Sequence, residues 1–539
     1  MLLLSLCACG DLQPPDVEET EAPAVSVEEP DEVVESGFAP ETEQAIADLV
    51  KMYGAKSDGY SATPYVVCDF DNTTAVFNIT MQCCVYQLER MAFAVDPEGL
   101  QAALSASLDL EAGDNADWIA DITAAYAALY EAYGPFTAAG LRDDRAAAVQ
   151  ADPQWQEFAA KMRALISHVQ STLDAPEANA WVLWRFTGMT EQEVYDLFYR
   201  SCMQYRDVET ERVTWTSPET LESRLGVVET SFTRGVSVPQ EVADMLRTLR
   251  TNGIDVWVCS ASHADGVRAA VDAFGLSDVV TGVIGMTQQI SEGVFVPDYD
   301  YETGYSYDNA GEGVWTRSEY LTGAIPSMEG KVTAIRNALM PRYRGAGPIA
   351  GFMDSGSDFN FCTEFTSLKL VVCFNRANRK ITDGAGLIAV VAVYQRDVLH
   401  YDLAKANEEG DTLFILQGRD ENGLRTLRAS DHTIRLGETE PSLFANADNQ
   451  VLLDYARTHK LTTQQLIDGF CIATPANDLG NLLSVDHGHL QSYSGYHSIP
   501  DEPLPPEEPE EEPEEASEEE PAKEAAEEPA QTPAEEPAA

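Results

Sequence analysis

The sequence predicts an α/β protein built on a doubly wound parallel sheet, with a helical cap domain inserted after the first strand. Short apolar runs of strand length recur at residues 65–68, 254–259 and 349–353. Each run ends in a polar residue before a turn, as strands of a parallel sheet do where they deliver side chains to its carboxyl edge. The interval 75–238, between the first two runs, is rich in helical periodicity. Alternating strands and helices with one long helical insertion predict this architecture.

The first strand, Tyr65-Val66-Val67-Cys68, is followed directly by Asp69-Phe70-Asp71-Asn72-Thr73. Alternate side chains of an extended chain share a face, so Asp69 and Asp71 can approach one point while Phe70 turns toward the core. One carboxylate can then attack phosphorus while the other handles the proton of an oxygen. A calcium-loop interpretation fails, because the segment lacks the glycine and the glutamate that such a loop needs.

The second strand, at residues 254–259, ends at Ser260 and precedes a helical pattern over residues 263–274. This order predicts a strand, a tight turn and a helix. At the carboxyl edge of a parallel sheet, Ser260 would offer its hydroxyl and the following backbone N–H groups to a phosphate oxygen.

The third and fourth elements add charge to the same edge. Lys331 precedes a helical pattern over residues 332–339, where it supplies a compact positive charge for a crowded group of carboxylates. The strand at 349–353 is followed by Asp354 and, four residues on, by Asp358. Two acids around a Gly-Ser turn suit a hard cation such as magnesium, which takes oxygen ligands.

In this order the four elements resemble the motifs of the haloacid dehalogenase superfamily of phosphatases, over roughly residues 60 to 400. The resemblance implies a Rossmann-like core, in which Asp69 is the nucleophile that forms an aspartyl-phosphate. It makes Asp71 the general acid and base, and it assigns Thr73 and Ser260 to the phosphate oxygens.

The resemblance also implies a magnesium site. Asp69, Asp71 and Asp354 would bind the metal, with Asp71 contributing its backbone carbonyl and Asp358 supporting the site. Lys331 would be a catalytic residue that neutralises charge on the phosphate. Two positions depart from the family pattern without removing a reacting group: Asn72 and Met353.

Within the superfamily, the first two motifs and the long helical insertion resemble the phosphoserine phosphatase-like branch, and most closely the bacterial phosphorylcholine phosphatases. This implies a small phosphomonoester substrate, phosphorylcholine or phosphoethanolamine, with phosphoserine as the alternative. Aromatic residues crowd one interval of the insertion, either as a cage for a quaternary ammonium group or as ordinary core packing. They are Trp181, Trp184, Phe186, Tyr195, Phe198, Tyr199, Tyr205 and Trp215.

Composition completes the division of the chain. The formal net charge is −56, of which residues 11–40 carry −10 and residues 501–539 carry −16. We expect a lipoprotein signal remnant at 1–10, an acidic linker at 11–40, a core at 41–74 and 239–400, a helical cap at 75–238, a C-terminal α/β extension at 401–498, and a disordered Pro/Glu tail at 499–539. So negative a chain lacks the basic footprint that nucleic acid requires.

The apolar start, with Leu6-Cys7-Ala8 before Cys9, resembles the end of a bacterial lipoprotein signal, with Cys9 as the lipidated residue. It implies a lipid anchor that holds the protein on the extracellular face of a bacterial cell membrane. The other cysteines have no framework spacing, so we expect buried thiols and no disulfide scaffold. Asp486-His487-Gly488-His489 is either a metal site or a polar loop.

The sequence therefore predicts a magnesium-dependent phosphomonoesterase. A function of another class is a surface binding lipoprotein whose phosphatase-like domain is inactive. Retention of the whole set of motif residues favours the enzyme, since a domain kept only for its shape has no need of them.

Overall fold

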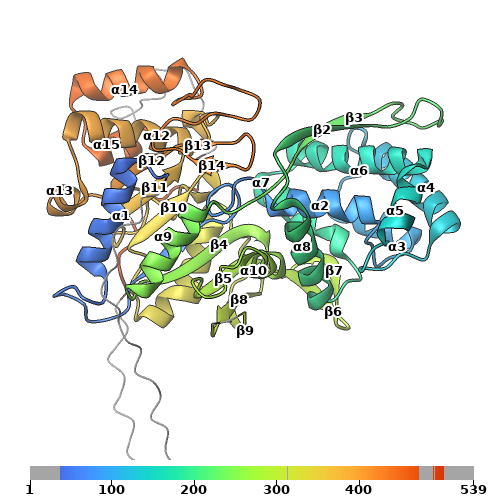
Figure 1. Cartoon of the computed structure of the whole chain (residues 1–539), viewed down its shortest axis with the longest axis horizontal. Coiled ribbons are helices and arrows are strands. Elements are labelled where there is room, and N and C mark those ends of the chain that lie inside the picture. The colour runs from blue at the N-terminus through green and yellow to red at the C-terminus, as the bar shows by residue number, and fades with distance from the viewer. Residues whose placement is uncertain (1–36, 312, 473–489, 491, 503–539) are drawn as a thin grey trace, which may run out of the picture.

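The computed structural model describes residues 37–311, 313–472, 490 and 492–502, and its centre is one eight-stranded sheet (Figure 1). The strand order is β12-β11-β10-β1-β4-β5-β8-β9. The strands, in chain order, are β1 Tyr65–Cys68, β4 Asp255–His263, β5 Gly282–Met286, β8 Thr303–Asn309, β9 Trp315–Leu321, β10 Ala350–Met353, β11 Leu370–Phe374 and β12 Leu413–Gln417. The six strands from β12 to β5 are parallel, and β8 and β9 extend the sheet in antiparallel pairing.

Both faces of this sheet are covered. Every residue of β1, β10, β11 and β12 is buried, as expected for parallel strands between two layers of helices. In β1, Val66 packs in one apolar cluster and its neighbour Val67 in the other. The helices on one face are α1 Pro40–Tyr53, α9 Gln240–Thr251, α10 Ala264–Ala273 and α13 Leu403–Glu408. The helices on the other face are α11 Glu329–Ala334, α12 Ala385–Tyr394, α14 Ala447–His459 and α15 Thr463–Cys471. The mixed α/β fold with a mostly parallel, Rossmann-like sheet is thus confirmed.

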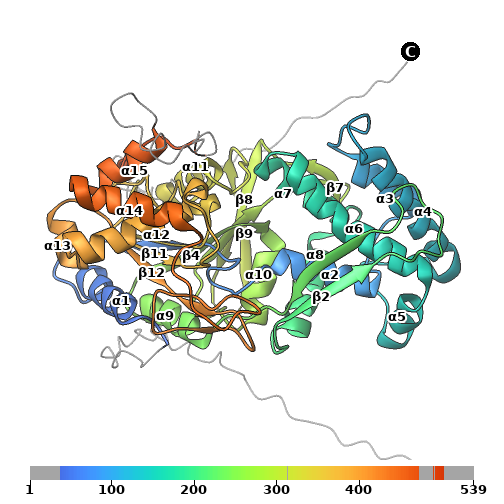
Figure 2. The ribbon, with the colours of Figure 1, turned by 90° about the horizontal axis from the view of Figure 1, so that it is seen from above.

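A largely helical region stands between β1 and β4 in the sequence, beside the sheet in both views (Figures 1 and 2). Its helices are α2 Ile79–Arg90, α3 Pro97–Ser105, α4 Asn115–Tyr133, α5 Asp143–Gln150, α6 Pro153–Thr172, α7 Ala175–Val182 and α8 Glu191–Tyr205. Helical periodicity in the sequence over residues 116–133, 155–173 and 191–205 predicts three of them, α4, α6 and α8, to within two residues. It did not predict the hairpin of β2 (Glu211–Thr216) and β3 (Glu229–Arg234) that follows.

The helical region contacts the rest of the chain at several places, two of which lie near the end of β4. Helix α8 packs along α10, the helix that follows β4. The second contact is a hairpin of β6 (Gln288–Ser291) and β7 (Val294–Tyr299), which exchanges backbone hydrogen bonds with the turn before α8. In these, Gly188 donates to Phe295 at 2.9 Å and Phe295 donates to Met189 at 2.8 Å. The insertion is therefore attached to the carboxyl edge of the sheet, beside the end of β4.

Three details differ from the sequence prediction. The strand expected to end at Ser260 continues to His263, because β5 pairs with it again at His263 and Met286 after a register shift. The helix expected to begin after Lys331 begins at Glu329, so Lys331 lies in its first turn. The segment 401–498, predicted as a C-terminal α/β extension, supplies β12 to the central sheet, where it pairs with β11.

Several predicted features lie outside the described residues. These are the signal remnant at 1–10, the linker up to residue 36, the tail from residue 503, and the Asp486-His487-Gly488-His489 segment. Among the described helices, none combines the length and the apolar character needed to cross a membrane. The cysteines of the described chain are unpaired, and all but Cys471 are buried, which agrees with the expectation of buried thiols.

Candidate active site

The pentad turns sharply where β1 ends. The backbone N–H of Asp69 donates to the carbonyl of Phe352 on the neighbouring β10 at 3.0 Å, and Phe70 is fully buried in the core. Asn72 adopts a φ of 64°, a left-handed conformation that asparagine tolerates better than most residues. The fully buried Arg419 donates to the Asn72 carbonyl at 2.7 Å, which braces this turn. The pentad is therefore a fixed turn that presents Asp69 beside β10.

Asp69 shares a buried ammonium group with Asp358. The Nζ of Lys331 donates to Asp69 Oδ1 at 2.6 Å and to Asp358 Oδ1 at 2.5 Å, and the lysine is completely buried. Burial raises the pKa of Asp69 well above its usual value, the nearby charge of Asp358 raises it further, and Lys331 opposes both. Burial alone would lower the pKa of Lys331, but the two carboxylates outweigh it and raise that pKa. The lysine therefore stays charged between the two acids.

Asp71 is held in a separate set of contacts. Its Oδ1 accepts the backbone N–H of Ile79 at 2.7 Å, and its Oδ2 accepts the hydroxyl of Ser262 at 2.5 Å. Ser262 Oγ in turn lies 2.6 Å from Thr80 Oγ1 of α2. Burial raises the pKa of Asp71 to about 6, although the hydrogen bonds from Ser262 and Ile79 lower it. A carboxyl group with that pKa exchanges its proton near neutral pH, as a general acid and base must.

Asp354 lies among the predicted phosphate and metal residues. Its Oδ1 accepts the hydroxyl of Thr73 at 3.3 Å, and its backbone N–H donates to Asp358 Oδ2 at 3.3 Å. Carboxylate oxygens of Asp69, Asp354 and Asp358 lie within 4.8 Å of one another, and all three residues are buried. This cluster is a candidate site for a metal ion, because three crowded buried carboxylates repel one another and Lys331 bridges only two of them.

The cluster differs from the predicted ligand set at one position. Asp358, expected to support the metal ligands, itself belongs to the group of three. The carboxylate of Asp71 accepts hydrogen bonds from Ser262 and Ile79, and its backbone carbonyl stays the predicted metal ligand. The predicted phosphate ligand Ser260 is buried on β4, and its Oγ accepts the backbone N–H of Ser262 at 3.2 Å.

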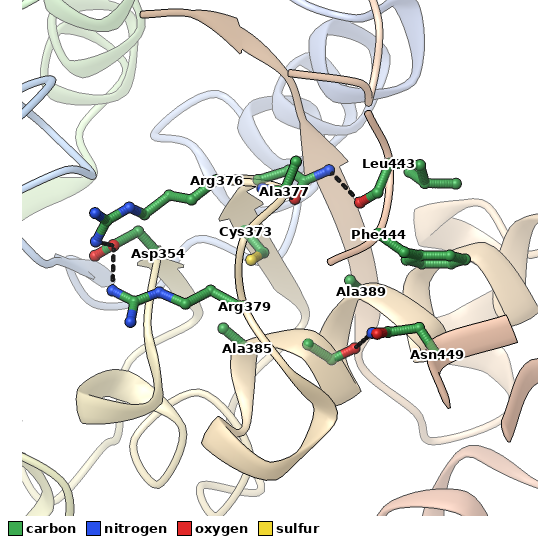
Figure 3. Close-up of a pocket in the computed structure, with 12 residues that line it drawn as sticks. Asp354, Cys373, Arg376, Ala377, Arg379, Ala385, Ala389, Leu443, Phe444 and Asn449 are labelled. Atoms are coloured by element: carbon green, nitrogen blue, oxygen red, sulfur yellow. Dashed lines mark hydrogen bonds and ion pairs between the residues drawn. The ribbon is translucent and has the colours of Figure 1, made fainter. Parts of the chain in front are cut away.

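Sequence reasoning missed two arginines beside Asp354. Arg376 Nη1 donates to Asp354 Oδ2 at 3.1 Å, and Arg379 Nη2 lies 3.6 Å from the same oxygen (Figure 3). Burial lowers the pKa of Arg376, the charge of Asp354 raises it, and Arg379 lowers it again. Both arginines follow β11 at the carboxyl edge of the sheet. Polar residues that follow parallel strands meet at this edge, so the reasoning that predicted the site of the acids also applies to these arginines. Ser262 could have been predicted in the same way, because it lies two residues beyond Ser260 at the end of the same strand.

The aromatic residues of the insertion are packed as a core. Trp181, Trp184, Phe186, Phe198 and Tyr205 are buried. The remaining members of the group also make internal contacts. Tyr195 donates to Asp272 at 2.7 Å, the Tyr199 ring stacks on Tyr195, and Trp215 packs edge-to-face on Phe232 and Trp155. Contacts within the described chain therefore favour ordinary packing over a cage.

No protein family and no curated protein matches the chain. Among solved structures, it resembles a conserved functionally unknown protein from Anaerococcus prevotii DSM 20548, with a TM-score of 0.58 and 23% identity over 76% of this chain and 99% of that chain. A protein of unknown function from Bordetella pertussis Tohama I aligns with a TM-score of 0.32 and 12% identity over 66% of this chain and 99% of its own. The first likeness shows a shared fold. Fold and site together define an α/β protein with a buried, lysine-bridged carboxylate cluster at its sheet edge.

Proposed function

We propose that the protein is a magnesium-dependent phosphomonoesterase of the haloacid dehalogenase type. The observation that carries this proposal is the placement of Asp69, which directly follows β1, accepts a hydrogen bond from a buried lysine and belongs to a group of three carboxylates. A buried carboxylate next to a cation site and a second titrating acid is the arrangement that nucleophilic phosphoryl transfer needs.

The proposed reaction has two steps. In the first, an oxygen of Asp69 attacks phosphorus, the bond to the leaving oxygen breaks, and Asp71 gives its proton to that oxygen. In the second, Asp71 takes a proton from water as the water oxygen attacks the aspartyl-phosphate, which releases inorganic phosphate and restores Asp69. Lys331 balances the charge that gathers on the phosphoryl oxygens, and Thr73 and Ser260 would hold those oxygens.

The residues present fit a hard divalent cation. Asp69, Asp354 and Asp358 offer only oxygen ligands, which suits magnesium rather than a soft metal. The backbone carbonyl of Asp71 is a further oxygen donor expected there. When bound, the metal would neutralise negative charge on the phosphate and the carboxylates.

We propose that the helical insertion acts as a cap that excludes water and selects the substrate. Its packing of α8 on α10, next to the end of β4, supports this role.

For the substrate, the resemblance implies phosphorylcholine or phosphoethanolamine, with phosphoserine as the alternative. The internal packing of the aromatic residues gives a choline cage no support, so substrate comparison must decide among them. The extracellular, lipid-anchored location remains a proposal that rests on the N-terminal sequence.

Hydrolysis of an aryl phosphate by the purified chain, with and without magnesium, tests the proposal. We expect turnover only with the metal and a loss of at least about 10³-fold in Asp69→Asn, because the nucleophile is removed. The matched control is Asp58→Asn, an exposed acid, which should keep wild-type rates. Wild-type turnover by Asp69→Asn would refute the nucleophile assignment. A wild-type chain that hydrolyses no phosphomonoester would favour the alternative of a surface binding lipoprotein.

A further inference from the structure

The loop after β11 sends two long basic side chains back over the end of β10 to the catalytic edge. Figure 3 shows Arg376 and Arg379 running side by side to Asp354, with both guanidinium groups on the side away from Phe444 and Asn449. Asp354 is the carboxylate that the proposed metal site shares with Asp69, within 4.8 Å. One acidic side chain therefore separates the guanidinium of Arg376 from the proposed nucleophile.

These two guanidinium groups have more donors than partners. A guanidinium has five N–H donors in a planar fork. Arg376 makes one hydrogen bond, to Asp354 at 3.1 Å, within the described chain, and its Nε is buried without a partner there. Arg379 has only ion-pair distances of 3.6 Å, to Asp354 Oδ2 and to Asp383 Oδ2, and its Nε is likewise unpartnered among the described residues. Most of their donor capacity is unused by the residues that the structure describes.

Arg419 shows what a structural arginine looks like in the same neighbourhood. It is fully buried and uses all three guanidinium nitrogens, donating to the carbonyl of Asn72 and twice to Glu421 Oε1 at 3.1 and 2.6 Å. In contrast, the side chains of Arg376 and Arg379 keep 21% and 32% of their surface exposed. They are accessible from solvent, as a ligand-binding pair must be.

We propose that Arg376 and Arg379 bind a second anionic group on the substrate, a carboxylate or a second phosphate, so that the enzyme prefers phosphomonoesters whose leaving group is negatively charged. The proposal rests on the phosphomonoesterase function proposed above and concerns only its specificity. Two adjacent planar forks match the oxygens of a carboxylate or phosphate, and the same charges disfavour a quaternary ammonium group at this position.

Matched substrates isolate the second anion. O-phosphoserine differs from phosphoethanolamine by one carboxylate, and glycerol 3-phosphate differs from glycerol 2,3-bisphosphate by one phosphate. Wild-type kcat/KM should be higher for the more anionic member of at least one pair. Which pair shows the preference identifies the anion as carboxylate or phosphate.

The variants Arg376→Gln and Arg379→Gln should reduce that preference about 10- to 100-fold, the usual loss for a hydrogen bond to a charged group, because kcat/KM for the more anionic member falls by that factor more than kcat/KM for the less anionic member. The control is Lys380→Gln, which removes a neighbouring exposed charge. Equal losses on both members of a pair would overturn the proposal, since the arginines would then only position Asp354. An absence of preference in the wild-type chain would overturn it as well.

A binding measurement separates this proposal from the proposed function. Calorimetric titration of the Asp69→Asn chain with the same four compounds, in magnesium, should show tighter binding of the more anionic member and loss of that difference on adding Arg379→Gln. If the wild-type chain hydrolyses nothing but this difference persists, the phosphatase function fails and the anion site stands. Turnover without any difference in affinity or in kcat/KM refutes the anion site alone.

Discussion

The hydrogen bond from Ser262 to Asp71 gives a direct test of the proposed acid–base chemistry. Burial raises the pKa of Asp71 to about 6, and the Ser262 hydroxyl, 2.5 Å from Oδ2, opposes that rise by stabilising the carboxylate form. In Ser262→Ala the carboxylate loses this donor, so the pKa of Asp71 must rise further. A hydrogen bond to a charged group contributes about 1.5–3 kcal/mol, which corresponds to a pKa change of about 1–2 units.

The pH profile of kcat/KM reports this change. Asp71 must be protonated to donate to the leaving oxygen, so activity falls as pH rises through its pKa in the free enzyme. The alkaline limb of Ser262→Ala should therefore move to higher pH by about 1–2 units when both profiles are recorded at saturating magnesium and constant ionic strength. The control is Ser201→Ala, a buried serine whose Oγ has no partner among the described residues. An alkaline limb that stays in place, or moves to lower pH, would refute the assignment of Asp71 as the acid.

Two further predictions concern the buried charges. Lys331→Met and Lys161→Met each remove a fully buried lysine that pairs with two carboxylates, so urea unfolding should show a loss of about 3–5 kcal/mol in both. Only Lys331→Met should also abolish turnover, and loss of activity in both would indicate a general folding defect. Magnesium at 100 times its dissociation constant should stabilise the wild-type chain against thermal unfolding by about 2.7 kcal/mol, and chelation should remove this gain. Asp354→Asn should show little gain, and an undiminished one would place the metal elsewhere.

The sequence predicted the parts of the site that depend on local pattern. Apolar strands buried on both faces, such as residues 65–68, are visible as continuous hydrophobic runs. Their carboxyl ends meet at one edge, so Asp69, Lys331, Asp354 and Asp358 were predicted to converge, and they do. Apolar residues that recur with the helical period of 3.6 residues likewise predicted α4, α6 and α8.

Contacts between distant segments were not predictable in this way. The extension of β4 to His263 depends on its second pairing with β5, a long-range contact with no local signal. The addition of β12 to the sheet similarly depends on a neighbour far away in the sequence. The position of Arg376 after β11 follows the same rule as the acids, but its contact with Asp354 was not predictable, because the sequence does not show that β11 lies beside β10.

The two proposed catalytic acids are anchored to different parts of the chain. Asp69 is held by the core, through the carbonyl of Phe352 on β10 and the ammonium group of Lys331. Asp71 is held largely by α2, the first helix of the insertion, because it accepts the Ile79 N–H directly and its donor Ser262 hydrogen-bonds to Thr80. Movement of α2 would therefore change the pKa and position of the acid while leaving the nucleophile in place. In the proposed reaction, proton transfer rather than nucleophilic attack would therefore be the step that responds to how the insertion sits on the core.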